Sequence, residues 1–251
     1  MIKQWRVVHN ICVVVSLLFF VQLAPAAGRF VTGIFTYDKR IEHGDFTWIS
    51  IHHIVQMLLA IAAIVIIAKV FRLHFGFGVG DKQTGLTHVA NFTIVALVYA
   101  LIWRIVMQVL FHANISDQPL NFSNIAGHIG FQLFLSGPSE EILFRALPMT
   151  VLLCSFQESK VIIKIGELKF SHVNIIAAVI FTLAHVAWTI NPFSLNASWM
   201  QLTLSMVLGL WYGIAYEESK SVIYPMAMHS IWNVVVVGAS YIHRAFLLYS
   251  H

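Results

Sequence analysis

The chain has 251 residues, of which 59% are hydrophobic and only 10% are charged, with a mean hydropathy of +0.79. A soluble domain carries roughly 25% charged residues, so this composition excludes a soluble globular protein and indicates an integral membrane protein. The formal charge of +4 does not indicate nucleic-acid binding, because the basic residues occupy short loops between apolar spans. No internal repeat or low-complexity tract is present, so we expect a single membrane domain over residues 1–251.

The first apolar segment runs from about Val7 to Gly28 and follows two basic residues, Lys3 and Arg6. The small residues 24–26 resemble a signal-peptidase site, as the basic start and apolar core also do. The segment is long enough to span a bilayer and further spans follow, so a retained anchor is favoured over a cleaved leader.

Two further spans follow in the first half of the chain. The second span covers about Thr47 to Phe71, and we expect His52 and His53 near its start to be solvated at the membrane interface. The third span, about His88 to His112, contains Arg104, which is interpreted as snorkelling to the interface. The alternative for this arginine is a partner for an internal carboxylate or for the C-terminal carboxylate of a peptide.

Residues 125–156 form an apolar stretch longer than one bilayer crossing, interrupted by Gly137-Pro138. Proline starts helices well and breaks their interiors, so the stretch is either one long kinked helix or a short helix followed by a second one. The remaining spans are predicted at about His172–Ile190, Trp199–Tyr216 and Val222–Tyr249. The sequence therefore predicts an all-α, polytopic transmembrane helix bundle of about seven or eight spans.

Seven crossings with a cytoplasmic N-terminus divide most of the basic residues unequally between the two sides of the membrane. The excess on the cytoplasmic side agrees with the positive-inside rule. Inside would lie Lys3, Arg6, Lys69, Arg72, Lys82, Lys160, Lys164, Lys169 and Lys220, and outside Arg29, Lys39, Arg40 and Arg244. Both cysteines, Cys12 and Cys154, fall in apolar runs without disulfide spacing, so buried thiols are expected.

Two adjacent acids, Glu140 and Glu141, are the only carboxylates inside a hydrophobic run. Ionisable groups are costly in lipid, so such residues usually face a cavity and serve a function. A helix that starts near Pro138 puts Glu141 and Arg145 four residues apart on one face, a favourable ion-pair spacing. Glu140 is turned about 100° from Glu141 and is expected to point elsewhere.

Further polar side chains occur in the later spans. His185 lies toward the end of the fifth predicted span, and His229 and Asn233 share one face of the last span. Together with Glu140, they form an acid, two imidazoles and an amide on three separate helices. Such a set suits hydrolysis, because an acid and a histidine can deprotonate a water while other donors stabilise an oxyanion.

Three motifs in successive apolar segments resemble those of the CAAX protease and bacteriocin-processing (CPBP, or Abi) family of intramembrane proteases. They read Glu140-Glu141-x-x-x-Arg145, Phe181-x-x-x-His185 and His229-x-x-x-Asn233. Each motif alone is weak, whereas the ordered set of three is specific. The resemblance covers residues 125–237, which are expected to form the catalytic core, with residues 1–113 as accessory spans.

The resemblance implies that Glu140 and His185 activate the water, and that His229 and Asn233 bind the oxyanion or complete the water site. It assigns Glu141 to the support of the helix architecture.

Supporting roles are implied for Arg145 and Phe181 as well, and Gly209 and Gly213 match the small residues that the family places in the sixth span. Two departures from the family pattern are Ala146, where glycine is frequent, and residues 217–220, where a small Thr-Gly-Ser turn is usual. These departures bear on the substrate rather than on the catalytic residues.

No cofactor is expected, because no HExxH spacing is present and asparagine is a poor zinc ligand. The alternative is a zinc ion held by Glu140, His185, His229 and Asn233. An aspartic-type dyad is disfavoured, since it requires two facing acids.

The leading function is an intramembrane endopeptidase that cuts a membrane-associated peptide or protein. Candidate substrates are a CAAX-type tail, a leader peptide, a pheromone or a bacteriocin precursor, in the cell membrane of a prokaryote. The alternatives are a non-catalytic immunity or signalling scaffold and a proton-coupled transporter, the latter disfavoured by the lack of an inverted repeat. The expected partners are the substrate and the lipid bilayer, with no nucleic acid, and the sequence carries no signal for an oligomeric state.

Overall fold

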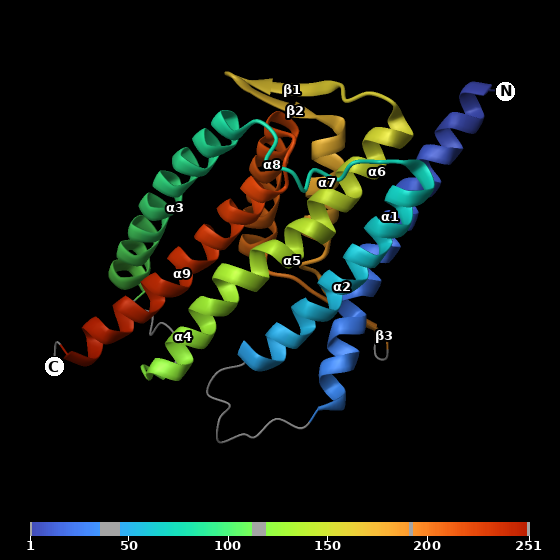
Figure 1. Ribbon diagram of the computed structural model, residues 1–251. Coiled ribbons are helices and arrows are strands. Elements are labelled where there is room, and N and C mark those ends of the chain that lie inside the picture. The colour runs from blue at the N-terminus through green and yellow to red at the C-terminus, as the bar shows by residue number, and fades with distance from the viewer. Residues whose placement is uncertain (1, 36–45, 112–118, 191–192, 250–251) are drawn as a thin grey trace.

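The computed structural model describes residues 2–35, 46–111, 119–190 and 193–249. In these ranges, seven helical segments run alternately between the two ends of a bundle, with the chain termini at opposite ends (Figure 1). They are α1 (Ile2–Ile34), α2 (Phe46–Phe71), α3 (Lys82–Phe111), the continuous α4 to α6 (122–156), α7 (His172–Leu183), α8 (Trp199–Ser219) and α9 (Ile223–Tyr249). The predicted all-α bundle is confirmed.

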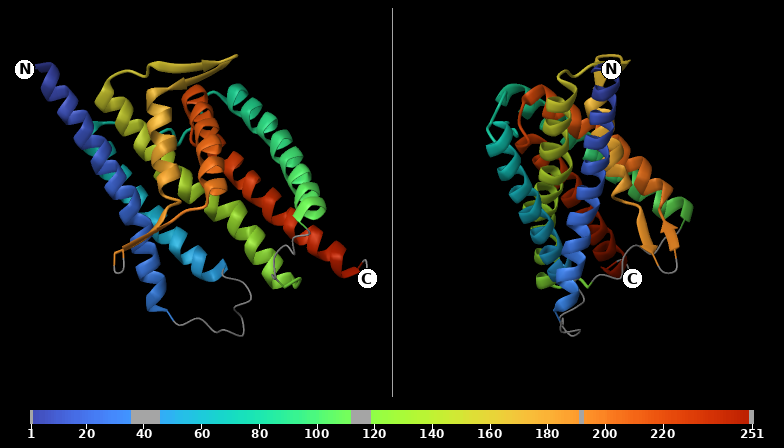
Figure 2. Two further views of the ribbon diagram at one scale, coloured as in Figure 1. Left: turned by 180° about the vertical axis from the view of Figure 1, so that it is seen from behind. Right: turned by 90° about the vertical axis from the view of Figure 1, so that its right-hand side faces the viewer.

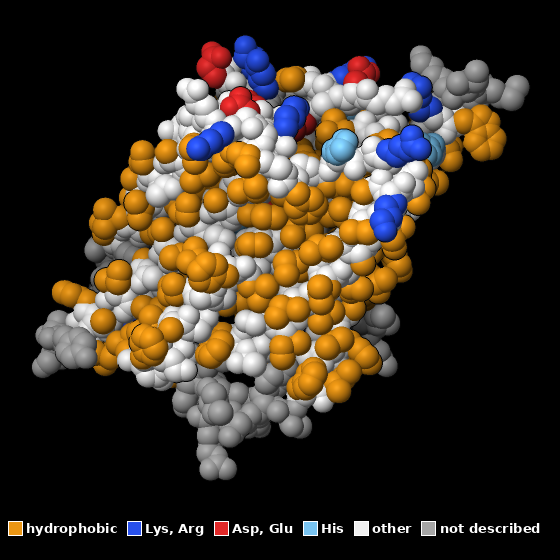
Figure 3. Space-filling view, in the orientation of Figure 1, with side chains coloured by type: hydrophobic (Ala, Val, Ile, Leu, Met, Phe, Trp, Pro, Cys, Tyr) orange, Lys and Arg blue, Asp and Glu red, His pale blue; other side chains and the backbone are white. Residues whose placement is uncertain are grey.

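The surface of the bundle is that of an integral membrane protein. Within the described ranges, α1, α2, α3 and α9 are long and apolar enough to cross a membrane, by length and composition. Hydrophobic side chains cover the middle of the face in Figure 3, and Lys and Arg side chains gather at its upper end. That end carries the strands β1 (Val161–Ile165) and β2 (Leu168–Ser171) and the α2–α3 connection, as expected if it faces the cytoplasm.

The long apolar stretch is one continuous helix with two wider turns. It consists of α4 (Phe122–Phe131), π-helical η1 (Gln132–Ser136), α5 (Gly137–Glu141), π-helical η2 (Ile142–Ala146) and α6 (Leu147–Phe156). Each π-helical turn ends two residues before a proline, Pro138 or Pro148. A proline removes one backbone hydrogen bond and crowds the carbonyl four residues earlier, and a widened turn accommodates both effects. Of the two alternatives, the single long helix is correct.

Polar side chains define where several helices begin. Asn121, Ser171 and Ser198 cap α4, α7 and α8 by accepting a hydrogen bond from the backbone N–H three residues later. Asp81 caps α3 and accepts from the backbone N–H and the hydroxyl of Thr84 at 3.1 and 2.9 Å. These hydrogen bonds hold the pKa of the Asp81 carboxyl below its usual range.

The predicted fifth span, about His172 to Ile190, is wrong in its second half. Helix α7 ends at Leu183, and the chain continues into a hairpin of β3 (Ala187–Ile190) and β4 (Phe193–Asn196). Hydropathy alone does not separate a short buried helix from an apolar strand that follows it. The consequence is that His185 lies in the turn after the helix rather than inside a span.

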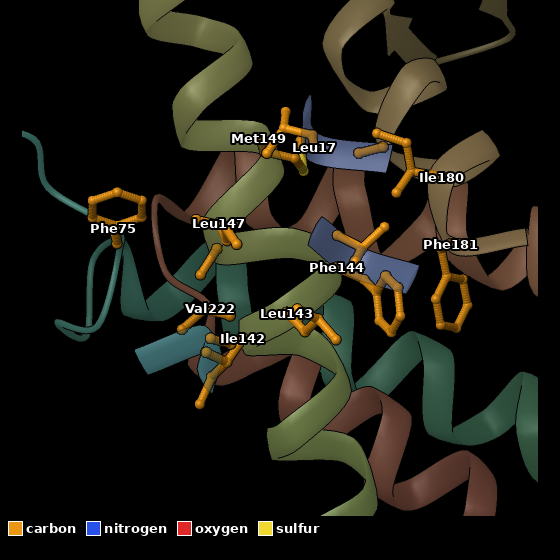
Figure 4. Packing of buried hydrophobic residues seen from close by; sticks show 14 of the residues in the cluster. Leu17, Phe75, Ile142, Leu143, Phe144, Leu147, Met149, Ile180, Phe181 and Val222 are labelled. Atoms are coloured by element: carbon orange, nitrogen blue, oxygen red, sulfur yellow. The ribbon is translucent and has the colours of Figure 1, made fainter. Parts of the chain in front are cut away.

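The middle of the long helix forms the centre of the core. All residues from 141 to 150 are buried, and Figure 4 shows Phe144 beside Phe181 of α7, with ring centroids 5.4 Å apart. Behind this helix, α7 and α8 lie next to each other (Figure 2). A Cβ at Gly213 of α8 would overlap the buried side chain of Asn174 on α7, so the close approach of these helices requires glycine there.

Two other expectations concern single side chains. Cys12 and Cys154 are free and exposed at the surface of the bundle, not buried, because both lie on helix faces turned outward in an apolar environment. The side chain of Arg104 lies outside the described residues.

Candidate active site

Glu140 is the central residue of the site. It lies on α5, between the two π-helical turns, and its side chain is 17% exposed. Its Oε1 is 3.9 Å from Nε2 of His53 on α2, and its Oε2 is 3.8 Å from Nε2 of His229 on α9. These distances are too long for direct hydrogen bonds and short enough for one water to contact both groups. The carboxylate therefore stands between imidazoles that come from two other helices.

The imidazole of His229 contacts both adjacent acids. Its Nδ1 is 2.8 Å from Oε1 of Glu141, while its Nε2 faces Glu140. The ring is buried and stacks on Tyr212, with centroids 5.3 Å apart and planes 20° from parallel. The expectation that Glu140 points away from the surroundings of Glu141 is therefore wrong. Although the two side chains are rotated about the helix axis, both face α9, and the two nitrogens of one ring bridge their separation.

Helix α9 approaches α5 closely because α5 begins with Gly137. A Cβ at this position would lie 2.8 Å from the backbone oxygen of Met226 and from the backbone nitrogen of Ser230. Any larger residue would thus have to move α9, which carries His229, away from the acid pair.

Glu141 and Arg145 form the ion pair predicted from their spacing, with Nε 3.4 Å from Oε2. Both side chains are 0% exposed. The guanidinium lies over the ring of Phe181, 4.7 Å from its centroid, and donates through Nη1 to the carbonyl of Phe144 at 2.8 Å. Glu141 thus has two cationic or donor partners, Arg145 on one oxygen and His229 on the other.

His53 is a member of the site that the sequence interpretation missed. It is buried rather than solvated, and its Nδ1 lies 2.6 Å from the hydroxyl of Ser139, the residue before Glu140. Gln56, one turn further along α2, donates through Nε2 to the same hydroxyl at 3.2 Å. The edge of the imidazole also meets Phe131, with ring centroids 5.0 Å apart.

The expectation of solvated histidines failed because a position near the end of an apolar span was taken as interfacial. His53 instead faces the long helix, where it contacts Ser139, and His52 lies against α1, where a Cβ at Gly28 would be 3.1 Å from its Nδ1. One signal was present in the sequence. His53 and Gln56 are three residues apart, so two polar groups share one face of an otherwise apolar helix.

His185 approaches the site from the turn after α7. Its Nδ1 is 2.9 Å from the carbonyl of Phe181, whose ring meets the imidazole edge-on at 4.8 Å between centroids. The same phenyl ring lies 6.0 Å from that of His229 and thus stands next to both histidines. His185 is within electrostatic range of Glu140.

Asn233 lies one turn beyond His229 on α9. Its Nδ2 donates to the hydroxyl of Ser136 at 3.0 Å, at the end of η1 and one turn before Glu140. The amide is therefore held against the same long helix that carries the acids. One of the two hydrogens on Nδ2 of Asn233 is thus used in the hydrogen bond to Ser136.

The imidazole and carboxylate groups are of the chemical types that bind zinc. Among the described side chains, however, no three His, Cys, Asp or Glu residues are gathered closely enough to hold a metal ion. The residues present thus do not form a ready metal site, and the geometry is that of an acid with two facing imidazoles.

Most residues of the site lie in a part of the chain that is similar to a known protein family. Residues 122–235 match the family described as Rce1-like, type II CAAX prenyl endopeptidase Rce1-like. The match includes Glu140 and His229, whereas His53 lies outside it. No curated protein and no solved structure matches the chain. The region from α4 to α9 is thus similar to the type II CAAX prenyl endopeptidases, which agrees with the resemblance of the three motifs to the CPBP family of intramembrane proteases.

Proposed function

We propose that this protein hydrolyses a peptide bond in a membrane-associated peptide or protein, with Glu140 as the general base that activates a water. The observation that carries the proposal is the position of the Glu140 carboxylate, 3.8–3.9 Å from two imidazole Nε2 atoms in a largely buried setting. A base must reach its proton directly or through one water, and this spacing meets that requirement.

In the proposed reaction, a water gives one proton to Glu140 while its oxygen attacks the carbonyl carbon of the scissile bond. The carbonyl oxygen becomes an oxyanion, which accepts hydrogen bonds from the imidazole of His229 and the amide of Asn233. The carbon–nitrogen bond then breaks, and Glu140 returns the proton to the departing amine. Glu141 supports the donor role of His229, because a carboxylate bonded to Nδ1 fixes the ring and balances a positive charge on it.

A metal-free reaction is part of this proposal, with zinc as the alternative. The two versions differ in what Glu140 does, since a carboxylate that binds zinc is not free to act as the base. Purified protein is expected to contain no stoichiometric zinc and to keep its activity after dialysis against a strong chelator. Zinc near one ion per chain, with activity lost on stripping and restored on refilling, would select the zinc-dependent protease.

The proposed substrates are short peptides or protein tails held at the bilayer, of the CAAX tail, leader peptide, pheromone or bacteriocin precursor type, in the cell membrane of a prokaryote. The family match supports a CAAX-type tail first. A non-catalytic scaffold of the same fold is not favoured by any contact described above.

The test compares membranes that contain active protein with membranes that contain Glu140→Gln. The variant keeps the size of the side chain, replaces one acceptor oxygen with an NH₂ donor, and removes its ability to take a proton. We expect peptide products, identified by mass spectrometry, to disappear with a fall in rate of about 10²–10⁴-fold and an unchanged melting temperature. Glu158→Gln is the matched control, because Glu158 is exposed and, within the described part of the chain, pairs with Lys160 at 2.7 Å. Equal product levels in both membranes would contradict the proposal.

A further inference from the structure

Helix α2 lies outside the segment that matches the protease family, yet it contributes an imidazole to the site. We infer that His53 is a further catalytic residue, which holds the nucleophilic water together with Glu140. The inference rests on the proposed function, because it assigns a role in the same hydrolytic step. It also gives the first half of the chain a chemical contribution in addition to a structural one.

The hydrogen bonds around Ser139 decide which nitrogen of His53 carries the proton. The Ser139 hydroxyl donates to the carbonyl oxygen of Ser136 at 3.1 Å, which uses its only hydrogen. With that hydrogen bond formed, Nδ1–H is the donor and the hydroxyl oxygen is the acceptor in the 2.6 Å contact with His53, and this tautomer is part of the inference. Gln56 donates to the second lone pair of this oxygen at 3.2 Å. Nε2 of Gln56 also lies 3.1 Å from Nδ1 of His53, because both nitrogens donate to the oxygen of Ser139.

This tautomer leaves the lone pair of Nε2 directed toward Glu140. Oε1 of Glu140 and Nε2 of His53 are both acceptors, 3.9 Å apart. Two acceptors at this distance can each receive one hydrogen of a single water, which orients the oxygen lone pairs of the water away from both. Nε2 therefore helps to fix the attacking water while Glu140 takes the proton from it.

The ring of His53 is fixed before any substrate binds. Ser139 and Gln56 hold Nδ1 and its acceptor, Phe131 meets the ring edge-on at 5.0 Å, and the side chain is buried. A base or water-binding group that is already oriented does not lose rotational freedom in the reaction. The neighbouring His52 differs, because its ring is parallel to that of Trp48, with centroids 5.7 Å apart. This difference provides an internal control.

The decisive measurement is the cleavage of a fluorogenic peptide that ends in a farnesylated cysteine followed by three residues, in proteoliposomes. His53→Gln keeps a polar side chain that can bond to Ser139, but an amide replaces the rigid ring and its basic nitrogen Nε2. We expect kcat to fall about 10²-fold or more, with KM changed by less than about 3-fold, as for loss of a group that acts on the proton-transfer step. His52→Gln should keep kcat within about 2-fold of the parent protein. An unchanged kcat for His53→Gln, at an unchanged melting temperature, would overturn the inference.

A parallel assay of Glu140→Gln separates this inference from the proposed function. If Glu140→Gln is inactive while His53→Gln retains full activity, the inference fails and the protease stands. If Glu140→Gln remains active, both the proposed function and the inference about His53 fail.

A second measurement tests the tautomer on which the role of His53 depends, even when the farnesylated peptide is not cut. In protein labelled with ¹⁵N-histidine, the resonances of His53, identified by their absence from His53→Gln, should report an Nδ1–H tautomer. Ser139→Ala should change the tautomer that they report, and His52→Gln should keep it, although the rings of His52 and His53 lie 5.2 Å apart. An Nε2–H tautomer in the parent protein would overturn the inference, because Nε2 could then not accept a hydrogen from the water.

Discussion

The two imidazoles beside Glu140 are held by partners of different charge. On the α9 side, His229 is bonded through Nδ1 to the Glu141 carboxylate, which is itself paired with Arg145. On the α2 side, His53 is bonded through Nδ1 to the neutral Ser139 hydroxyl. A carboxylate balances a positive charge on imidazole, whereas a hydroxyl does not.

This difference suits the two rings to opposite tasks. The α9 side is adapted to donate hydrogen bonds to a developing oxyanion, because an imidazolium can be tolerated next to Glu141. The α2 side is adapted to accept a hydrogen from water through a neutral imidazole. Substitutions on either side should thus separate the functions of the two histidines.

Among single substitutions of the groups that hold the two imidazoles, the largest effect is expected from Glu141→Gln, which removes the charged support of the α9 side. Arg145 would remain buried without its counter-ion, at a cost of about 3–5 kcal/mol in the free energy of unfolding. The ring of His229 would also lose its anionic partner, and kcat should fall about 10²–10³-fold. Thermal unfolding in detergent and kinetics in proteoliposomes measure the two effects. A stable variant with full activity would show that the carboxylate neither supports the fold nor orients the histidine.

The double variant His53→Gln/His185→Gln sharpens the comparison, because His185 also lies within electrostatic range of Glu140. Each single substitution is expected to lower kcat about 10²-fold if each imidazole contacts the attacking water. Groups that act on one water are not independent, so the double variant should be less impaired than the product of the single effects. Multiplicative losses would instead assign the two histidines to different steps.

A smaller effect is expected from Gly137→Ala, which tests the spacing between α5 and α9. The added Cβ would meet the backbone of Met226 and Ser230 at 2.8 Å, and such overpacking costs about 1–3 kcal/mol. Gly130→Ala on the same long helix is the control, since a Cβ there meets nothing within 4 Å. That control should gain up to about 1 kcal/mol from the helix propensity of alanine. Equal changes in melting temperature for both variants would refute the close-packing argument.

The smallest effect is expected from Ser139→Ala on the α2 side. Loss of this hydroxyl leaves His53 Nδ1 and Gln56 without their shared acceptor, which should cost about 1–3 kcal/mol at most. The imidazole remains present, so kcat should fall only about 10-fold, well below the effect of replacing His53 itself. Ser139→Thr, which retains the hydroxyl, should restore most of the rate. A loss as large as that of His53→Gln would mean that the hydroxyl itself contacts the reacting atoms.

The sequence by itself determined the membrane class, most helix positions and the pair of Glu141 and Arg145. Long apolar runs define spans without knowledge of their neighbours, because each helix satisfies its own backbone hydrogen bonds. The pair follows from helical periodicity alone, since residues four apart share one face. The three motifs also indicated the family, which the match over residues 122–235 confirms.

Only the tertiary structure decided which side chains from different helices meet. His53 lies 86 residues before Ser139, and no local pattern states that α2 packs beside α5. The contact of both acids with His229 likewise depends on the approach of α9 at Gly137. Periodicity describes the faces of one helix, whereas the choice of neighbouring helices depends on how closely their backbones can approach. For that reason, the acids of this site were visible in the sequence, and one of the two imidazoles that face Glu140 was not.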